Sequence, residues 1–210
     1  MIKLYYAPRA CSLASHIALE EAGAEYEAVR VDFASNEQRG PAYRQINAKA
    51  RVPTLVTEGG ALTETPAILA YIARTFPQAG LASDDAFAFA QMDAFNVFLA
   101  SSVHVAFAHA FRPGRFADDE TAWPAMKAKA PLAVDEYLGL VETMFADGRP
   151  WVHGETYSTS DPYLLVMERW LARDGFGGPD RFEGLRGHRE RMNARPAVQK
   201  ILAREGERII

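Results

Sequence analysis

The sequence contains a single cysteine, Cys11, among 210 residues. One thiol cannot form an internal disulfide, and it cannot build a metal site from several cysteine ligands. An excess of positive charge is also missing, because 27 acidic residues outnumber 23 basic ones and the formal net charge is −4. Nucleic acids and acidic membrane surfaces attract proteins with a positive field, so this balance disfavours both as partners.

Long apolar runs are absent as well. No stretch reaches the roughly 18 consecutive apolar residues of a membrane-spanning helix. Residues 1–6 (MIKLYY) lack the charged-then-apolar order and the cleavage site of a secretory signal. The sequence therefore predicts a cytoplasmic protein with no membrane partner. Hydrophobic residues make up 49% and charged residues 24% of the chain, which indicates a globular fold rather than a disordered or collagen-like one.

Residues 1–77 alternate between strand and helix patterns. Strands are expected near 2–6, 26–32, 53–57 and 61–63, and helices near 12–22, 42–46 and 65–76. Thr65 is expected to cap the last of these helices, with Pro66 as its first residue. The order β–α–β, connection, β–β–α predicts an α/β domain.

The remainder of the chain carries only helical patterns. A break at residues 78–86, which contains proline and glycine, predicts a linker between domain 1–77 and an all-helical domain 87–210. Helices are expected over 86–111, 122–146 (with a kink or interruption at Pro131), 161–173, 185–193 and 197–204. The basic residues between 186 and 195 are interpreted as the solvated face of a helix.

Cys11 lies where the first strand gives way to the first helix. The free N–H groups and partial positive charge of a helix N-terminus stabilise an anion such as a thiolate. Ser12 offers a hydrogen bond to the same sulfur, and Arg9 adds positive charge nearby. Two interpretations stand side by side: a reactive thiol of lowered pKa, and a small buried apolar residue. Since no second cysteine is present, disulfide chemistry would need an outside thiol.

Three segments of the chain resemble bacterial cytosolic glutathione transferases, most closely the cysteine-containing beta class. They are residues 4–13 (LYYAPRACSL), 47–53 (NAKARVP) and 62–68 (LTETPAI), supported by His104 and by 158–161 (STSD). The resemblance implies a thioredoxin-like N-terminal domain that holds glutathione as co-substrate, without a metal. It further implies an all-helical bundle as C-terminal domain, which supplies the pocket for a second substrate, and a homodimer.

The resemblance also implies roles for the residues of these segments. Cys11 would face the glutathione sulfur, and the backbone of Val52 would pair with the cysteinyl part of the tripeptide. Pro53 would be a cis-proline that turns Val52 toward the site, whereas the pattern alone indicates an ordinary strand start. Arg51 would reach the glycyl carboxylate.

Glu64 and Thr65 fit the γ-glutamyl end of glutathione, which carries an ammonium and a carboxylate side by side. Glu64 can pair with the ammonium, while the Thr65 hydroxyl and the helix N-terminus receive the carboxylate. The competing interpretation is that Thr65 is only a helix cap and Glu64 a surface charge.

Hydroxyls near the first strand and a histidine complete the candidate site. Other glutathione transferases stabilise the thiolate with a Tyr or Ser hydroxyl, so Ser12 is expected to support Cys11, with Tyr6 as a further candidate. Alternatively, Tyr6 belongs to the core and Ser12 is a cap. The resemblance places His104 near the glutathione thiol, where a neutral imidazole can exchange a proton; the alternative is a satisfied interior histidine.

The chain departs from the beta-class pattern at several positions. Asn36 or a neighbour stands in place of a lysine that contacts glutathione, Val97 in place of an asparagine, and Val105 in place of a lysine. These changes predict weaker glutathione binding or a different preferred substrate. Because proline cannot continue a helix at its fourth position, Asp161 is expected to be a helix cap with Pro162 as first helical residue.

The predicted function is that of a glutathione transferase in detoxification, which conjugates or exchanges the glutathione thiol with small hydrophobic electrophiles. Cys11 would either stabilise the glutathione thiolate or form a mixed disulfide with it, as a thiol transferase or peroxidase does. Glutathione-dependent isomerisation, dehalogenation and ether cleavage are narrower versions. A non-catalytic binding or regulatory protein on the same scaffold is the alternative, because fold alone does not fix function.

Overall fold

The computed structural model describes residues 1–210, and its first half is built around a four-stranded sheet. Its elements are β1 (Ile2–Tyr6), α1 (Ser12–Glu21), β2 (Tyr26–Arg30), α2 (Pro41–Ile46), β3 (Thr54–Thr57), β4 (Gly60–Thr63) and α3 (Thr65–Thr75). The strand order is β2-β1-β3-β4, with β1 parallel to β2 and antiparallel to β3. This order confirms the predicted α/β domain and its thioredoxin-like form.

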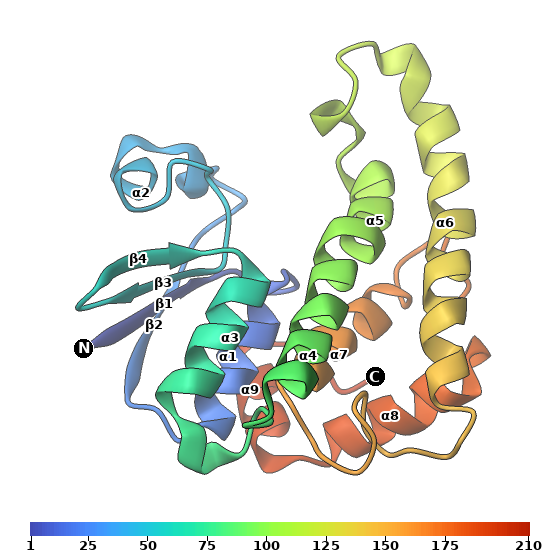
Figure 1. The fold of residues 1–210 in the computed structure, drawn as a ribbon. Helices are drawn as coiled ribbons and strands as arrows, with labels where there is room; N and C mark the ends of the chain where they lie inside the picture. The colour runs from blue at the N-terminus through green and yellow to red at the C-terminus, as the bar shows by residue number, and fades with distance from the viewer.

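The sheet is covered by α1 and α3, which lie side by side in Figure 1. Leu4 of β1 pairs with Leu55 of β3, and both side chains are fully buried. In α1 every residue from Ser12 to Leu19 is buried. A helix that is buried around its whole circumference must be packed on several sides.

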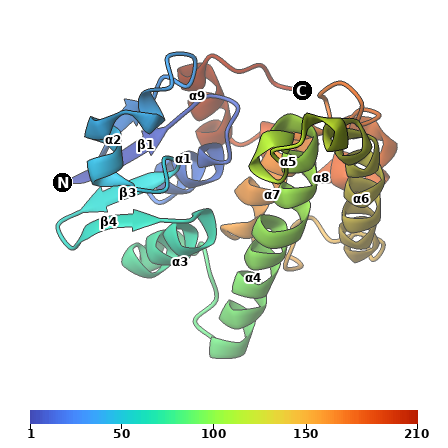
Figure 2. The same cartoon turned by 90° about the horizontal axis from the view of Figure 1, so that it is seen from above.

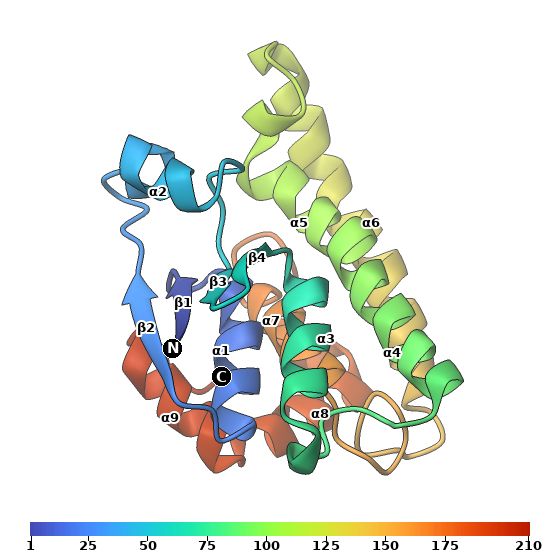
Figure 3. The ribbon, with the colours of Figure 1, turned by 60° about the vertical axis from the view of Figure 1, so that its left-hand side comes forward.

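The second half is helical, as predicted. It consists of α4 (Ala86–Phe98), the π-helical turn η3 (Leu99–Val103), α5 (His104–Phe111), α6 (Trp123–Met144), α7 (Ser160–Trp170), α8 (Glu183–Asn193) and α9 (Pro196–Glu205). Short 3-10 turns are η1 (Glu37–Arg39), η2 (Pro77–Ala79), η4 (Pro113–Arg115), η5 (Glu120–Ala122) and η6 (Pro179–Arg181). Pro131 lies inside α6 without interrupting it. Figure 3 shows α4 and α5 as one long rod beside α6.

The two halves share one core. Helix α1 packs against α3 on one side and against α7 and α9 on others, so it lies between the sheet and the helical half (Figure 2). A single cluster of 38 buried residues includes Leu4 and Ile17 of the first half and Tyr163 and Ile201 of the second. The predicted linker, residues 78–86, begins within η2 and ends on Ala86, the first residue of α4. This shared core fixes the geometry of any site between the halves.

The start of α7 corrects one expectation. The Ser158 N–H donates to Asp161 Oδ2 at 2.7 Å, and the Ser158 hydroxyl accepts the Ser160 N–H at 3.2 Å. The two bonds form a capping box around Ser158, one residue before the cap position Thr159. Asp161 lies inside the first turn of α7, so the prediction of Asp161 as cap was wrong. Pro162 has no N–H to donate to the Ser158 carbonyl. The Asp161 N–H donates to this carbonyl instead, at 3.2 Å, so the proline leaves no acceptor unsatisfied.

The basic segment of α8 is another correction, since part of it is buried rather than solvated. His188 is fully buried between Glu168 (Nδ1 to Oε1, 2.9 Å) and Asp161 (Nε2 to Oδ1, 3.2 Å). Burial opposes the charge on this imidazole, but the two carboxylates prevail and raise its pKa to about 9. His188 therefore ties α8 to both ends of α7.

One helix, the continuous Ala86–Phe111, is long and apolar enough to cross a membrane by length and composition alone. A core helix of a water-soluble protein passes the same test, so this property is weak evidence for a membrane span. Phe87 and Val97 on α4 are 72% and 52% exposed.

Candidate active site

A cavity lies where the first half of the chain meets α5 and α7. It is lined by 24 residues from the β1–α1 loop, the loop after β2, the segment before β3, the β4–α3 junction, η3, α5 with the turn after it, and α7 with the loop that follows. Seven residues predicted from the sequence line it: Cys11, Arg51, Val52, Pro53, Glu64, Thr65 and His104. The structure thus brings together side chains separated by more than ninety positions in the chain.

Ser12 and Tyr6 are the two predicted residues that do not line the cavity. The fully buried Ser12 hydroxyl donates to the Ala7 carbonyl and accepts the Ala7 N–H, both at 3.2 Å, which secures the β1–α1 loop. The Tyr6 ring is buried against His16, with 4.7 Å between ring centroids. Tyr6 therefore belongs to the core, as its alternative interpretation states. Ser12 is not a cap, because Cys11 takes the cap position of α1 and the Ser12 hydroxyl bonds the Ala7 backbone instead.

Cys11 occupies the cap position of α1 and points its sulfur toward the segment before β3. Its Sγ donates a weak hydrogen bond to the Val52 carbonyl at 3.6 Å. Burial raises the pKa of the Cys11 thiol, and the Thr65 side chain and the Arg112 charge only partly oppose this effect. The thiol is therefore held protonated, which disfavours the interpretation as a reactive thiol of lowered pKa.

The segment before β3 presents the Val52 backbone to the cavity. The Val52-Pro53 peptide bond is cis, as the resemblance implied. The buried Asn47 amide donates to the Arg51 carbonyl at 2.8 Å and to Thr54 Oγ1 at 2.9 Å, and the Tyr43 hydroxyl also donates to the Arg51 carbonyl at 2.7 Å. These bonds fix the segment in place, and in the cavity the Val52 carbonyl accepts the weak bond from Cys11 Sγ.

The β4–α3 junction contributes Glu64 and Thr65. Glu64, rather than Thr65, is the cap of α3, and its φ of 73° lies in the left-handed region that L-residues seldom adopt. Its carboxylate pairs with Lys49 Nζ at 2.5 Å, with both side chains half exposed. Thr65 is buried, and its side chain influences the pKa values of both Cys11 and Tyr163. Strained backbone of this kind is found preferentially at functional sites.

The opposite side of the cavity is formed by α5 and α7. The His104 ring packs edge-on against Trp170, with 4.8 Å between centroids, directly after the π-helical turn. Burial and the charges of nearby arginines, Arg115 and Arg112 first among them, lower its pKa to about 4, so the imidazole is neutral at pH 7. Trp170 Nε1 and an Arg173 guanidinium nitrogen both donate to the Arg9 carbonyl, at 3.2 and 2.9 Å.

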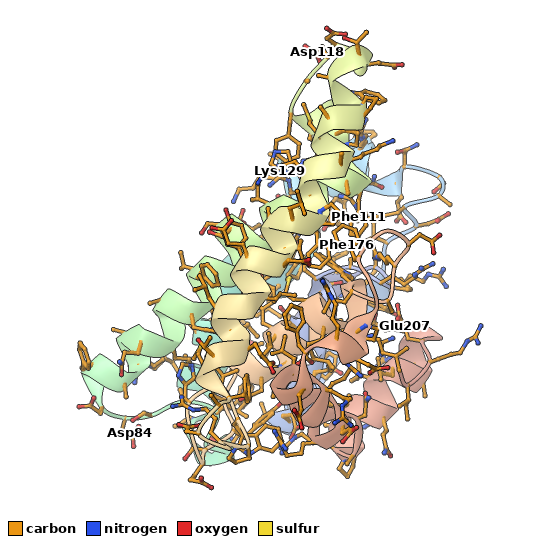
Figure 4. All side chains as sticks on the ribbon, turned by 90° about the vertical axis from the view of Figure 1, so that its right-hand side faces the viewer. Asp84, Phe111, Asp118, Lys129, Phe176 and Glu207 are labelled. Carbon is orange, nitrogen blue, oxygen red and sulfur yellow. The ribbon has the colours of Figure 1, made fainter.

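Several lining residues were missed from the sequence. They are chiefly arginines and aromatic residues of the second half: Arg112, Arg115, Arg173, Phe116, Tyr163 and Trp170. Phe111 also lines the cavity, and its ring lies against that of Phe176 at 5.4 Å between centroids (Figure 4). The clearest signal available was the position of Arg112 and Arg115 around the Pro113-Gly114 helix stop. No group of three or more His, Cys, Asp and Glu side chains is arranged to hold a metal ion.

Comparison with known proteins agrees with this geometry. The model of the glutathione S-transferase N-terminal domain matches residues 1–74. The glutathione S-transferase GstA of Escherichia coli O157:H7 is 32% identical over 98% of this chain and 99% of its own. A glutathione transferase homologue from Sulfitobacter, solved with bound glutathione, is 40% identical with a TM-score of 0.91 over 97% of this chain and 98% of its own. The beta-class enzyme of Sphingomonas chungbukensis is 37% identical with a TM-score of 0.85, over 97% and 98% of the two chains.

A thioredoxin-like domain joined to a helical bundle, with a cavity between them, defines the class of cytosolic glutathione transferases. The chain belongs to the glutathione S-transferase family. Among solved structures it is similar to bacterial members, including one of the beta class.

Proposed function

We propose that the protein conjugates reduced glutathione to small electrophiles in this cavity. The observation that carries the proposal is the assembly of Cys11, Val52, Thr65 and His104, from both halves of the chain, around one space. The Sulfitobacter relative, which was solved with bound glutathione, supports glutathione as the thiol substrate.

The residues fit each charged group of the tripeptide. Glu64 can take the γ-glutamyl ammonium once Lys49 yields its place, and Thr65 with the first turn of α3 can take the neighbouring carboxylate. Arg51, exposed at the rim, can take the glycyl carboxylate. Once Cys11 Sγ turns from the Val52 carbonyl, the Val52 backbone can pair with the cysteinyl residue between them.

Cys11 acts on the glutathione sulfur as a hydrogen-bond donor. Because its own thiol stays protonated, its S–H can turn from the Val52 carbonyl toward a thiolate placed beside it. This stabilises the thiolate, which then attacks the electrophile, and orientation beside the electrophile supplies a further rate increase. Neutral His104 can donate or accept a proton at the same place. The raised pKa favours this role over a mixed disulfide.

A conjugation assay with a chlorodinitrobenzene tests the proposal. We expect turnover by the wild-type protein, a loss of about fivefold in kcat/KM for Cys11→Ala, and recovery in Cys11→Ser, which restores a donor. Glutathione binding without conjugation of any electrophile would contradict the proposal and favour a non-catalytic binding protein. Equal loss in the Ala and Ser variants, with disulfide exchange present only in the wild type, would favour a nucleophilic Cys11.

We further propose that the protein is a homodimer in the cytoplasm. Phe87 and Val97 leave apolar surface of α4 exposed, and a second copy would cover it. Reduced glutathione is maintained in reducing compartments, which supports the location. Light scattering at micromolar concentration is expected to give twice the chain mass of 23.2 kDa; a monomer would contradict the assembly.

A further inference from the structure

The cavity concentrates positive charge in a chain that is acidic overall. Its lining contains six cationic side chains, Arg9, Lys49, Arg51, Arg112, Arg115 and Arg173, and one carboxylate, that of Glu64. The whole chain has a net charge of −4, so this local excess is not a consequence of composition.

The arginines of the cavity lack acidic partners. Lys49 is paired with Glu64, but none of the five arginines forms a salt bridge, whereas Arg169, Arg181 and Arg195 outside the cavity all do. Burial, followed by the charges of Arg51 and Arg112, lowers the pKa of Arg115, which shows that these guanidinium groups lie within electrostatic reach of one another. Like charges gathered without counter-ions favour an anionic ligand.

Glutathione does not account for the whole excess. As a thiolate it carries two net negative charges, whereas the lining carries five net positive ones. Arg51 and Lys49 lie on the side of the cavity formed by the first half and can serve the tripeptide. Arg112 and Arg115, at the end of α5 and in the turn after it, lie on the opposite side.

Aromatic rings stand beside these arginines. The Arg112 guanidinium lies 5.7 Å from the centroid of the Phe33 ring, and that of Arg115 lies 5.6 Å from Phe116. Phe111 and Trp170 line the same cavity. Flat apolar walls with cations at the edge fit a planar molecule that carries an acidic group.

We infer that the electrophile of this enzyme bears a carboxylate next to an aromatic or unsaturated carbon framework, and that Arg112 and Arg115 bind this carboxylate. This inference rests on the proposed glutathione conjugation. The planar guanidinium group matches a carboxylate through two parallel, charge-assisted hydrogen bonds, which a neutral carboxamide with its single acceptor oxygen cannot form. In an aromatic substitution the glutathione sulfur bonds to the ring carbon, chloride leaves with the electron pair of the C–Cl bond, and the thiol proton passes to solvent.

The test uses a matched pair of electrophiles, a chloronitrobenzoate and the corresponding chloronitrobenzamide. For each, kcat/KM is divided by the rate constant of the uncatalysed reaction with glutathione, which removes the difference in intrinsic reactivity. We expect this ratio to be about tenfold higher for the benzoate. Arg112→Gln and Arg115→Gln should each lower the benzoate value about tenfold and the benzamide value no more than threefold, with the benzoate preference weakening as salt is added.

Arg44→Gln is the matched control, because Arg44 is exposed on α2, outside the cavity, and its loss changes the net charge equally. It should leave both ratios unchanged. Equal ratios for the two electrophiles in the wild type would overturn the inference, as would equal losses in the arginine variants, which would assign these residues to the thiolate. Calorimetry with glutathione alone distinguishes failure of the proposed function from failure of this inference. If glutathione does not bind, the proposed function is contradicted. If glutathione binds and the benzamide is turned over without a preference for the benzoate, only this inference is contradicted.

Discussion

The two sides of the cavity are built in different ways. The side from the first half carries its polar side chains, such as those of Glu64 and Thr65, on unusual backbone: a cis peptide at Val52-Pro53, the first turn of α3, and bends at which Arg9, Ala50 and Glu64 have φ values of 63°, 55° and 73°. The side from the second half consists of side chains projecting from α5 and α7, such as those of His104 and Trp170.

This difference indicates a division of labour. Side chains held in place by a cis peptide and by left-handed bends have little freedom to vary, so they suit a ligand that does not vary, here the tripeptide. Side chains on rigid helices can be exchanged without altering the fold, so they suit recognition of the electrophile. Substitutions on the first-half side should therefore change glutathione binding, and substitutions on the second-half side should change the reaction with the electrophile.

The largest expected effect concerns His188, which lies buried between two carboxylates of α7 and so holds this helix of the second half in place. The raised pKa of His188, about 9, means that the folded state holds a proton that the unfolded state loses above its ordinary pKa of about 6.5. Protonated His188 therefore contributes on the order of 3 kcal/mol to the free energy of unfolding below pH 6.5, and this contribution is lost as the pH rises through 9. Urea unfolding at several pH values should show this fall, and His188→Gln should flatten it. The same slope in the variant would contradict the assignment.

On the glutathione side, Thr65→Val should weaken glutathione binding about thirtyfold, because a hydrogen bond to a charged group is lost. Thr65→Ser keeps the hydroxyl and should stay within about threefold of the wild type. Isothermal calorimetry measures both, with thermal melts as the check on folding. Wild-type affinity in Thr65→Val would show that the γ-glutamyl group binds elsewhere.

Glu64→Gln should weaken glutathione binding about tenfold, since the ammonium loses its charged partner. Glu58→Gln, at the exposed β3–β4 turn and 94% exposed, removes the same charge outside the cavity and serves as control. Equal affinities of the two variants for glutathione would argue that Glu64 is only a surface charge.

These two sides also differ in how far the sequence predicted them. The side of the cavity from the first half is formed by three contiguous segments of the sequence, so Cys11, Val52-Pro53 and Glu64-Thr65 could be predicted. Arg112, Arg115 and Arg173 were missed because their meeting depends on how α5 and α7 pack, which no local pattern records. Tyr6 and Ser12 flank the predicted loop, at the end of β1 and the start of α1, but both are buried outside the cavity, which depends on core packing.

The smallest expected effect concerns His104. With a pKa of about 4, His104 stays neutral between pH 5.5 and 8, so its titration does not make the conjugation rate change with pH in this range. His104→Gln should lower the rate and leave the midpoint of any acid limb unchanged. A shifted midpoint would show that His104 titrates during turnover.

The most direct measurement is the structure of the protein crystallised with reduced glutathione. We expect the γ-glutamyl group at Glu64 and Thr65, the sulfur in contact with Cys11, and Arg112 and Arg115 free of the tripeptide. Glutathione carboxylates bound to Arg112 and Arg115, with the sulfur remote from Cys11, would contradict it.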